Sequence, residues 1–222
     1  MADSDSHREE RPDAGSEGDP VPLIIRSVEF VGSLVSAKQS PPSPLPQIAF
    51  AGRSNVGKSS LINRVLGRPK QKPARVSATP GKTQALNFFE VNGAFYVVDL
   101  PGSGYARAPE RIRRGWEELV SGFLTGSSHL RGVVYLVDAR HPPTAGDQAF
   151  VERLAESGIP TLIALTKLDK LRNTERERLG ERVIQPLAVP DDQVVRSSSK
   201  TGEGIDELLA AMGDLLAENE DS

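Results

Sequence analysis

The sequence contains no cysteine, and aromatic residues make up 5% of it. The absence of cysteine excludes disulfides, thiolate metal sites and a cysteine nucleophile. The scarcity of aromatics argues against binding single-stranded nucleic acid by base stacking. No apolar run approaches the roughly 18 residues of a membrane helix, and the N-terminal residues lack the apolar stretch of a signal peptide. We therefore expect a cytoplasmic protein with no membrane partner.

The rest of the composition indicates one globular domain with an acidic tail. The chain has 222 residues, of which 37% are hydrophobic and 26% charged, enough to bury a substantial core. Residues 1–20 hold seven acidic and two basic side chains and too little apolar surface to offset the entropy of ordering. We predict a disordered tail over 1–20, a folded domain over 21–217 and a disordered end over 218–222. The tail carries −5 and the remainder +2 of the formal net charge of −3.

Strand and helix patterns alternate along most of the folded part. Short apolar runs predict strands at 47–50, 85–91, 94–100, 132–138, 161–166 and 193–197. Helical patterns lie at 59–67, 144–157, 171–187 and 205–217. Residues 23–46 give no clear element, and 68–83 form a long loop. Asn92 and Gly93 predict a hairpin turn. The sequence therefore predicts an α/β fold with a mostly parallel six-stranded sheet, one antiparallel strand and helices on both faces.

The stretch "GRSNVGKSS", which begins at Gly52, fits the phosphate-binding pattern G-x-x-x-x-G-K-[ST]. It lies between a predicted strand and a predicted helix, the context that the motif requires. Its backbone N–H groups would surround a β-phosphate at the helix N-terminus. Lys58 would neutralise β- and γ-phosphate oxygens, and the Ser59 hydroxyl would ligate Mg²⁺. The nucleotide-binding residues predicted here are Gly52, Arg53, Ser54, Asn55, Val56, Gly57, Lys58 and Ser59. A chance glycine-rich turn is the alternative.

The segment "TKLD", Thr166, Lys167, Leu168 and Asp169, indicates which base is bound. The Asp169 carboxylate can accept hydrogen bonds from guanine N1–H and the exocyclic amine, and adenine offers no such pair of donors. The aliphatic stem of Lys167 can lie along the base. An isolated tetrapeptide of this kind is otherwise a solvated loop, but its place after a core strand, downstream of the phosphate loop, favours GTP and GDP as ligands. A backbone N–H of the segment from Ser198 could reach guanine O6.

The segment "DLPG", Asp99 to Gly102, ends the second strand of the predicted hairpin. Asp99 would reach Mg²⁺ through water, and the Gly102 N–H would bond the γ-phosphate. Hydrolysis would release this contact, which is the order–disorder switch of GTPases.

Together these motifs resemble the EngB (YihA/YsxC) family of bacterial ribosome-biogenesis GTPases. The resemblance spans roughly residues 23–217 and is carried by "GRSNVGKSSLIN", "TPGKTQALNFFEV", "VVDLPGSGYA", "VDARHPP" and "TKLDK". It implies a Ras-like P-loop NTPase domain that binds GTP and Mg²⁺ and acts in large ribosomal subunit assembly. It also implies an associated role in normal cell division and septation.

The resemblance extends the set of expected site residues. It implies nucleotide contacts at Gly81, Lys82, Thr83, Gln84, Ala85, Asp99, Leu100, Pro101, Gly102, Ser197, Ser198 and Ser199. It also implies Thr83 as a metal ligand beside Ser59. Two features depart from the family: Ser103 stands where an aromatic residue is usual, and the acidic tail lies outside the resemblance.

Basic residues gather near the predicted switch segments. Six basic and no acidic residues lie from Arg64 to Lys82. A second group consists of Arg107, Arg111, Arg113 and Arg114. A basic surface made of nucleotide-responsive loops would bind the rRNA of a large ribosomal subunit precursor in a nucleotide-dependent way. A solvated surface with no partner is the alternative.

The residue after Gly102 is Ser103, where many GTPases place a glutamine that orients water. We therefore expect slow hydrolysis, with catalytic contributions from Lys58, Asn55, Thr83 and Gly102. Several similar GTPases that also lack the glutamine use an asparagine in the position of Asn55 to ligate K⁺. The alternative is that Asn55 only braces the loop.

The predicted function is therefore that of a monomeric GTP-binding protein that hydrolyses GTP to GDP. A GTP-dependent scaffold for division proteins, with incidental hydrolysis, is the alternative. An ATP-using kinase is disfavoured by Asp169.

Overall fold

The structure is a computed structural model that describes residues 23–36, 39, 41, 43–67, 85–102 and 110–217, without the side chains of 111–113. The predicted tail, the predicted C-terminal end and the predicted loop over 68–83 lie outside these residues. The division of the chain into a domain with two disordered ends therefore stays a prediction.

The described strands form one seven-stranded sheet in the order β1-β3-β4-β2-β5-β6-β7. Their bounds are Val28–Leu34 (β1), Gln47–Gly52 (β2), Leu86–Val91 (β3), Phe95–Asp99 (β4), Leu130–Asp138 (β5), Thr161–Thr166 (β6) and Val194–Arg196 (β7). β3 is antiparallel to both of its neighbours, and the pairs β2–β4, β2–β5, β5–β6 and β6–β7 are parallel. The α/β fold and the single antiparallel strand are confirmed.

The predicted count of six strands is wrong because β1 adds a seventh within the described residues. β1 lies at the sheet edge and pairs with β3 alone. Its register shifts between Phe30 and Gly32, and Phe30 is 51% exposed. An edge strand with a bulge and an exposed aromatic does not show the clean alternation that identifies a strand in the sequence.

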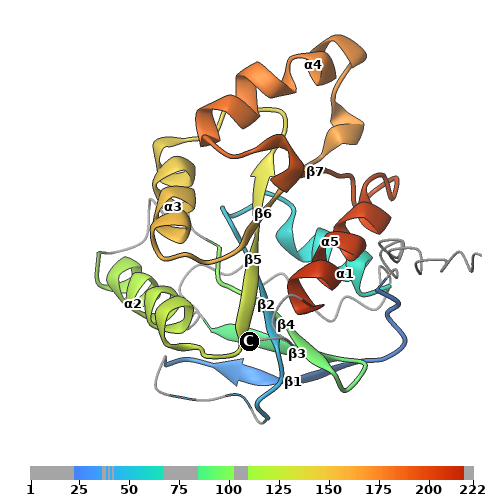
Figure 1. Ribbon diagram of the computed structural model, residues 1–222. Coiled ribbons are helices and arrows are strands. Elements are labelled where there is room, and N and C mark those ends of the chain that lie inside the picture. Colours follow the sequence, from blue (N-terminus) through green and yellow to red (C-terminus); the bar gives the residue numbers. More distant parts are fainter. Residues whose placement is uncertain are drawn as a thin grey trace, which may run out of the picture.

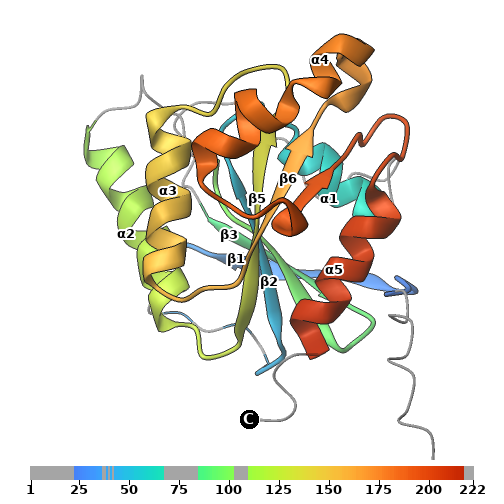
Figure 2. The ribbon, with the colours of Figure 1, turned by 45° about the horizontal axis from the view of Figure 1, so that its top comes forward.

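Helices cover both faces of the sheet (Figures 1 and 2). α1 (Lys58–Val65) and α5 (Ile205–Ala217) lie on one face, and α2 (Glu110–Gly126) and α3 (Ala145–Glu156) on the other. α3 begins with a capping box in which Thr144 and Asp147 satisfy each other's backbone N–H groups, so its predicted start is confirmed.

The predicted helix over 171–187 is broken into shorter pieces. The structure has α4 (Asn173–Glu177), a π-helical turn η2 (Gly180–Ile184) and a 3₁₀ turn η3 (Gln185–Leu187). Gly180 weakens the helical pattern and Pro186 lacks an N–H donor, so a continuous helix is disfavoured here. Two further 3₁₀ turns are η1 (Leu168–Lys170) and η4 (Asp191–Gln193).

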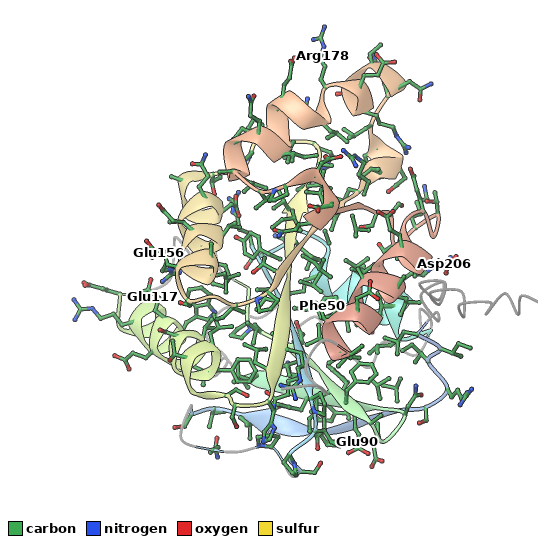
Figure 3. All side chains as sticks on the ribbon, in the orientation of Figure 1. Phe50, Glu90, Glu117, Glu156, Arg178 and Asp206 are labelled. Atoms are coloured by element: carbon green, nitrogen blue, oxygen red, sulfur yellow. The ribbon has the colours of Figure 1, made fainter. Side chains whose placement is uncertain are left out.

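The core has one apolar cluster on each face of the sheet. Within β2, Ile48 and Phe50 pack with α1 and α5, whereas Ala49 and Ala51 pack with α2 and α3. Phe50 is fully buried near the centre of the molecule in Figure 3. Burying a side chain of this size contributes about 1.5–3 kcal/mol. The near-continuous apolar strands of the sequence are thus explained by burial on both faces.

The parallel strands bring their carboxyl ends to one edge of the sheet. The segments that follow β2, β4, β5, β6 and β7 therefore meet there, although they are far apart in the sequence. In open α/β sheets this edge is where ligands bind.

Candidate functional site

The segment from Gly52 to Lys58 joins β2 to α1 in a tight turn. Gly52, Asn55 and Gly57 have φ of 154°, 65° and 109°, which are conformations that favour glycine and asparagine. A Cβ on Gly52 would lie 2.9 Å from the Leu136 backbone oxygen, so glycine is required there. Gly57 caps α1. The predicted strand–turn–helix context of the phosphate-binding pattern is confirmed.

Lys58, the first residue of α1, forms an ion pair with Asp99 at the end of β4. The two side chains are 10% and 8% exposed, so little water screens their attraction. The pair places one cation and one carboxylate beside the phosphate loop. It links two predicted site segments, one after β2 and one at the end of β4.

The segment after Asp99 packs directly on the phosphate loop. A Cβ on Gly102 would lie 3.2 Å from both the backbone nitrogen and the Oγ of Ser54. The indole Nε1 of Trp116, on α2, donates to the Pro101 backbone oxygen at 2.9 Å. α2 is therefore joined to the predicted switch segment, a contact that the sequence did not reveal.

Two side chains of the "TKLD" segment also contact the phosphate loop. The buried Thr166 hydroxyl donates to the Val56 backbone oxygen at 2.7 Å, and Lys167 Nζ donates to the Asn55 backbone oxygen at 2.6 Å. Lys167 itself has a left-handed backbone with φ of 65°. The predicted phosphate and base segments are therefore brought together.

Asp138, at the end of β5, belongs to this cluster and was not predicted. Its Oδ2 accepts from Lys167 Nζ at 2.9 Å and from Arg140 Nη2 at 2.7 Å, and its Oδ1 accepts from Arg140 Nε at 2.9 Å. Burial acts to raise the pKa of the Asp138 carboxyl, but the hydrogen bonds from Arg140 and Lys167 outweigh it and hold the pKa well below its ordinary value of 3.8. Asp138 is thus a fixed anion that holds Lys167 in place.

Asp169 presents one satisfied and one unsatisfied oxygen. Its Oδ1 accepts from the Ser198 hydroxyl at 2.8 Å. Its Oδ2 is buried without a hydrogen-bond partner among the described residues, and Lys170 Nζ lies 3.7 Å away, beyond hydrogen-bond distance. Burial opposes ionisation, but the Ser198 hydroxyl and the charges of Lys170 and Lys200 keep the pKa of the Asp169 carboxyl below its ordinary value. A buried, ionised oxygen of this kind fits a ligand that offers N–H donors.

The segment after β7 completes this side of the site. Ser197 and Ser198 are fully buried, and the Ser197 N–H and hydroxyl both bond the Leu165 backbone oxygen, at 2.7 and 3.0 Å. Ser199, the next residue, is partly buried. Ser198 therefore contacts Asp169 directly, whereas Ser197 anchors the segment to β6.

Some predicted site residues cannot be placed. Gly81 to Gln84, with Thr83 among them, and Ser103 lie outside the described residues. Ala85 directly precedes β3 and is partly buried. The described part of the chain has no cluster of three or more His, Asp or Glu side chains that could hold a metal ion. The Ser59 hydroxyl on α1 and the Asp99 carboxylate are hard oxygen donors beside the phosphate loop, which suits Mg²⁺ shared with nucleotide phosphates.

Comparisons with known proteins agree with this arrangement. Residues 47–167 match the model of a family described as 50S ribosome-binding GTPase. Two proteins named probable GTP-binding protein EngB are similar over most of their length. The one from Gemmatimonas aurantiaca is 44% identical and covers 88% of this chain and 95% of its own. The one from Pelotomaculum thermopropionicum is 43% identical and covers 86% and 96%. A crystal structure of a probable GTP-binding protein engB superposes with a TM-score of 0.62, at 26% identity, over 78% of this chain and 99% of its own.

The fold and the phosphate loop, together with the match to the GTPase family model, define a P-loop GTPase, an enzyme that hydrolyses GTP. Within that class, the chain belongs to the EngB family of GTP-binding proteins. None of the helices in the described part of the chain is both long and apolar enough to span a membrane.

Proposed function

We propose that this GTPase is a cytoplasmic, monomeric assembly factor of the large ribosomal subunit, with the family's associated role in normal cell division and septation. The observation that carries the proposal is the match of residues 47–167 to a family described as 50S ribosome-binding GTPase. The stretch of sequence from Arg64 to Lys82 has six basic residues and no acidic one, a charge that suits rRNA phosphates.

The site residues have separate roles in this proposal. Lys58 balances charge on the β- and γ-phosphates, and Asp169 reads the guanine N1–H and exocyclic amine. The backbone from Ser198 onward approaches guanine O6. These roles rest on the cation beside the phosphate loop and on the buried Oδ2 of Asp169, which has no hydrogen-bond partner among the described residues.

Mg²⁺ would be held by Ser59, by Thr83 and, through water, by Asp99. Bound there, the ion would neutralise charge that develops on the phosphates. In the reaction, the oxygen of a water molecule bonds to the γ-phosphorus while the bond to the β–γ bridging oxygen breaks, giving GDP and inorganic phosphate. Gly102 packs beside Ser54, and its N–H would donate to the γ-phosphate and hold it in line. Positioning and charge stabilisation therefore carry the chemistry, with no covalent intermediate.

Co-sedimentation with large-subunit precursors tests the proposal. Binding should be strong with a non-hydrolysable GTP analogue and weak with GDP, because the loops that meet the γ-phosphate would form the contact surface. Lys58→Ala, which should lose nucleotide affinity, is the control and should sediment equally with either nucleotide. Absence of particle binding in every nucleotide state would refute the proposal. Nucleotide-dependent binding to division proteins in place of particles would support the scaffold alternative.

A further inference from the structure

Arg176 on α4 forms a two-pronged ion pair with Glu203, in the segment between β7 and α5. Arg176 Nη1 lies 2.6 Å from Glu203 Oε1, and Nη2 lies 3.0 Å from Oε2. Nη2 also donates to the Leu168 backbone oxygen at 3.0 Å. One guanidinium group therefore bonds two segments that are separated in the sequence, and each of them carries part of the base-reading site.

Each partner of Arg176 is connected directly to the Asp169–Ser198 pair, one by a peptide bond and the other by a hydrogen bond. Leu168 directly precedes Asp169. The Glu203 backbone oxygen accepts from the Ser198 N–H at 2.9 Å, and the Ser198 hydroxyl donates to Asp169. Arg176 thus closes a ring of contacts around the hydrogen bond that orients the Asp169 carboxylate.

The segment from Ser198 to Gly204 needs such support. Gly202 and Gly204, on either side of Glu203, have φ of 93° and 71°, and glycine has more backbone freedom to lose than any other residue. The Arg64 side chain packs against Gly202, where any Cβ would overlap it. The segment is therefore held by contacts from α1 and α4 in addition to its own internal hydrogen bonds, such as that from the Gly202 N–H to the Ser198 backbone oxygen at 2.8 Å.

The exposure of the ion pair bears on how it acts. The side chains of Arg176 and Glu203 are 34% and 39% exposed, and simple ion pairs at such sites contribute little to folding stability. The paired geometry, however, fixes direction as well as distance, because both guanidinium nitrogens are engaged. Its effect is then expected on the alignment of the site more than on the free energy of unfolding.

We propose that Arg176 and Glu203 are positioning residues for guanine recognition: they align the Oδ2 of Asp169 with the exocyclic amine of the base. The inference rests on the proposed reading of guanine by Asp169. It adds two residues to the site, neither of which contacts the nucleotide.

The test compares GDP with inosine diphosphate, which lacks the exocyclic amine but keeps N1–H and O6. In the unchanged protein, the hydrogen bond from this amine to a charged oxygen should favour GDP by about 10- to 100-fold. Arg176→Ala and Glu203→Gln should each reduce that preference at least about fivefold, because a misaligned carboxylate loses the amine contact first. Arg176→Lys keeps the positive charge but cannot make the bidentate contact with Glu203, and should give an intermediate preference for GDP.

Arg178→Ala is the matched control, since it removes the same charge two residues away. Arg178 is exposed and points out from the molecule in Figure 3. It should keep the preference of the unchanged protein. The thermal midpoint is measured for every variant, because a purely structural role would lower it while weakening GDP and inosine diphosphate equally. If Arg176→Ala fails to fold, Glu203→Gln carries the same expectation and Arg176→Lys carries the intermediate one.

The Asp169→Asn variant distinguishes a failure of the positioning role of Arg176 and Glu203 from a failure of guanine reading by Asp169. If that variant gains affinity for xanthosine diphosphate while Arg176→Ala and Glu203→Gln keep the full preference for GDP over inosine diphosphate, the positioning role is overturned and the guanine reading stands. If Asp169→Asn alters no base preference, the guanine reading itself fails. A reduced preference in both the Arg176→Ala and the Glu203→Gln variants, with Arg178→Ala unchanged, supports the inference.

Discussion

The Nζ atom of Lys167 lies 2.6 Å from the backbone oxygen of Asn55 and 2.9 Å from Oδ2 of Asp138. One side chain thus joins the "TKLD" segment, the phosphate loop and the end of β5. Because Lys167 bonds an anion and a carbonyl at once, the charge state of Asp138 controls how firmly the two halves of the site are held together.

We predict that Asp138 makes the stability of the protein sensitive to acid. The pKa of its carboxyl in the folded protein lies below the ordinary value of 3.8, so the folded state binds this proton more weakly than the unfolded state. The stabilisation is therefore fully present above the unfolded pKa and is lost as the pH falls through the folded one. Asp138→Asn should lower the thermal midpoint at pH 7, and the difference from the unchanged protein should shrink below about pH 4.

Thermal melts of the two proteins between pH 7 and pH 3 check this expectation. Asp192→Asn is the control, because Asp192 is exposed and its replacement should leave the thermal midpoint close to that of the unchanged protein. A difference between Asp138→Asn and the unchanged protein that stays constant over the range would contradict the prediction.

A second prediction concerns base choice at Asp169. Asp169→Asn should weaken GTP binding by about 2–4 kcal/mol, since the guanine donors lose a charged acceptor. The new amide can donate to the C2 oxygen of xanthosine triphosphate, whose affinity should rise. Competition titrations measure the affinities of both proteins for GTP and for xanthosine triphosphate. An unchanged GTP affinity in Asp169→Asn would exclude guanine reading by Asp169.

The sequence predicted those parts of the site that are formed by short contiguous motifs. The phosphate loop, "DLPG", "TKLD" and the segment after β7 each follow a strand, and the parallel sheet brings them together as expected. The residues it missed act through partners distant in the sequence. Arg176 and Glu203 are 27 residues apart. Both are charged residues in segments that contain no recognisable motif. Asp138 lies within "VDARHPP", a stretch that carries the family resemblance but suggests no role for this carboxylate. Its pairing with Lys167 depends on the adjacency of β5 and β6.

The same reasoning explains the errors in the fold. β1 was missed because Phe30 is exposed and the register shifts between Phe30 and Gly32. The helix over 171–187 was predicted too long because apolar spacing continues through Gly180 and Pro186, whereas the backbone does not. Local patterns therefore predicted the regular buried strands well, and predicted the edge strand and the irregular helical segment after β6 poorly.

A third prediction uses Trp116, the only tryptophan of the chain. Its indole N–H bonds the Pro101 backbone oxygen, next to Gly102, and it lines a cleft of about 110 Å³ between α2 and α3. A contact of Gly102 with the γ-phosphate would move this carbonyl and change the surroundings of the indole. Tryptophan emission should therefore differ between the protein with GDP and with a GTP analogue, and Trp116→Phe supplies the blank. Identical emission spectra in the two states would show that Pro101 does not move.

A fourth prediction tests the proposed rRNA surface. Changing Arg68, Lys70, Lys72 and Arg75 to alanine should weaken particle binding and reduce the slope of log affinity against log salt by about one unit for each rRNA phosphate that is no longer neutralised. Nucleotide affinity should be nearly unchanged. Alanine at the exposed Arg26 and Arg178 is the control and should leave the slope unaltered. If the four-residue variant sediments with particles like the unchanged protein at every salt concentration, the contact surface lies elsewhere.

The last prediction concerns Asn55, the residue expected to ligate K⁺ in place of a catalytic glutamine. Its backbone is left-handed, with φ of 65°, and its backbone oxygen is bonded by Lys167, so the loop is held by main-chain contacts. Two roles stay open for the Asn55 side chain: it can brace the loop, or it can ligate a cation. A cation held by the amide oxygen would stabilise charge that develops on the β–γ bridging oxygen.

Turnover should then be faster in potassium than in sodium at equal ionic strength, with Mg²⁺ saturating and particles present. Asn55→Gly is the informative variant because glycine adopts the same left-handed backbone without strain while removing the amide oxygen. It should abolish the difference between the two salts and retain GTP binding, whereas Asn55→Ala adds backbone strain and should also lower affinity. Asn55→Asp keeps an oxygen ligand and should keep a preference for potassium. Equal rates in both salts for the unchanged protein would leave Asn55 with a structural role alone, because a bound cation that does not alter the rate cannot be stabilising the transition state.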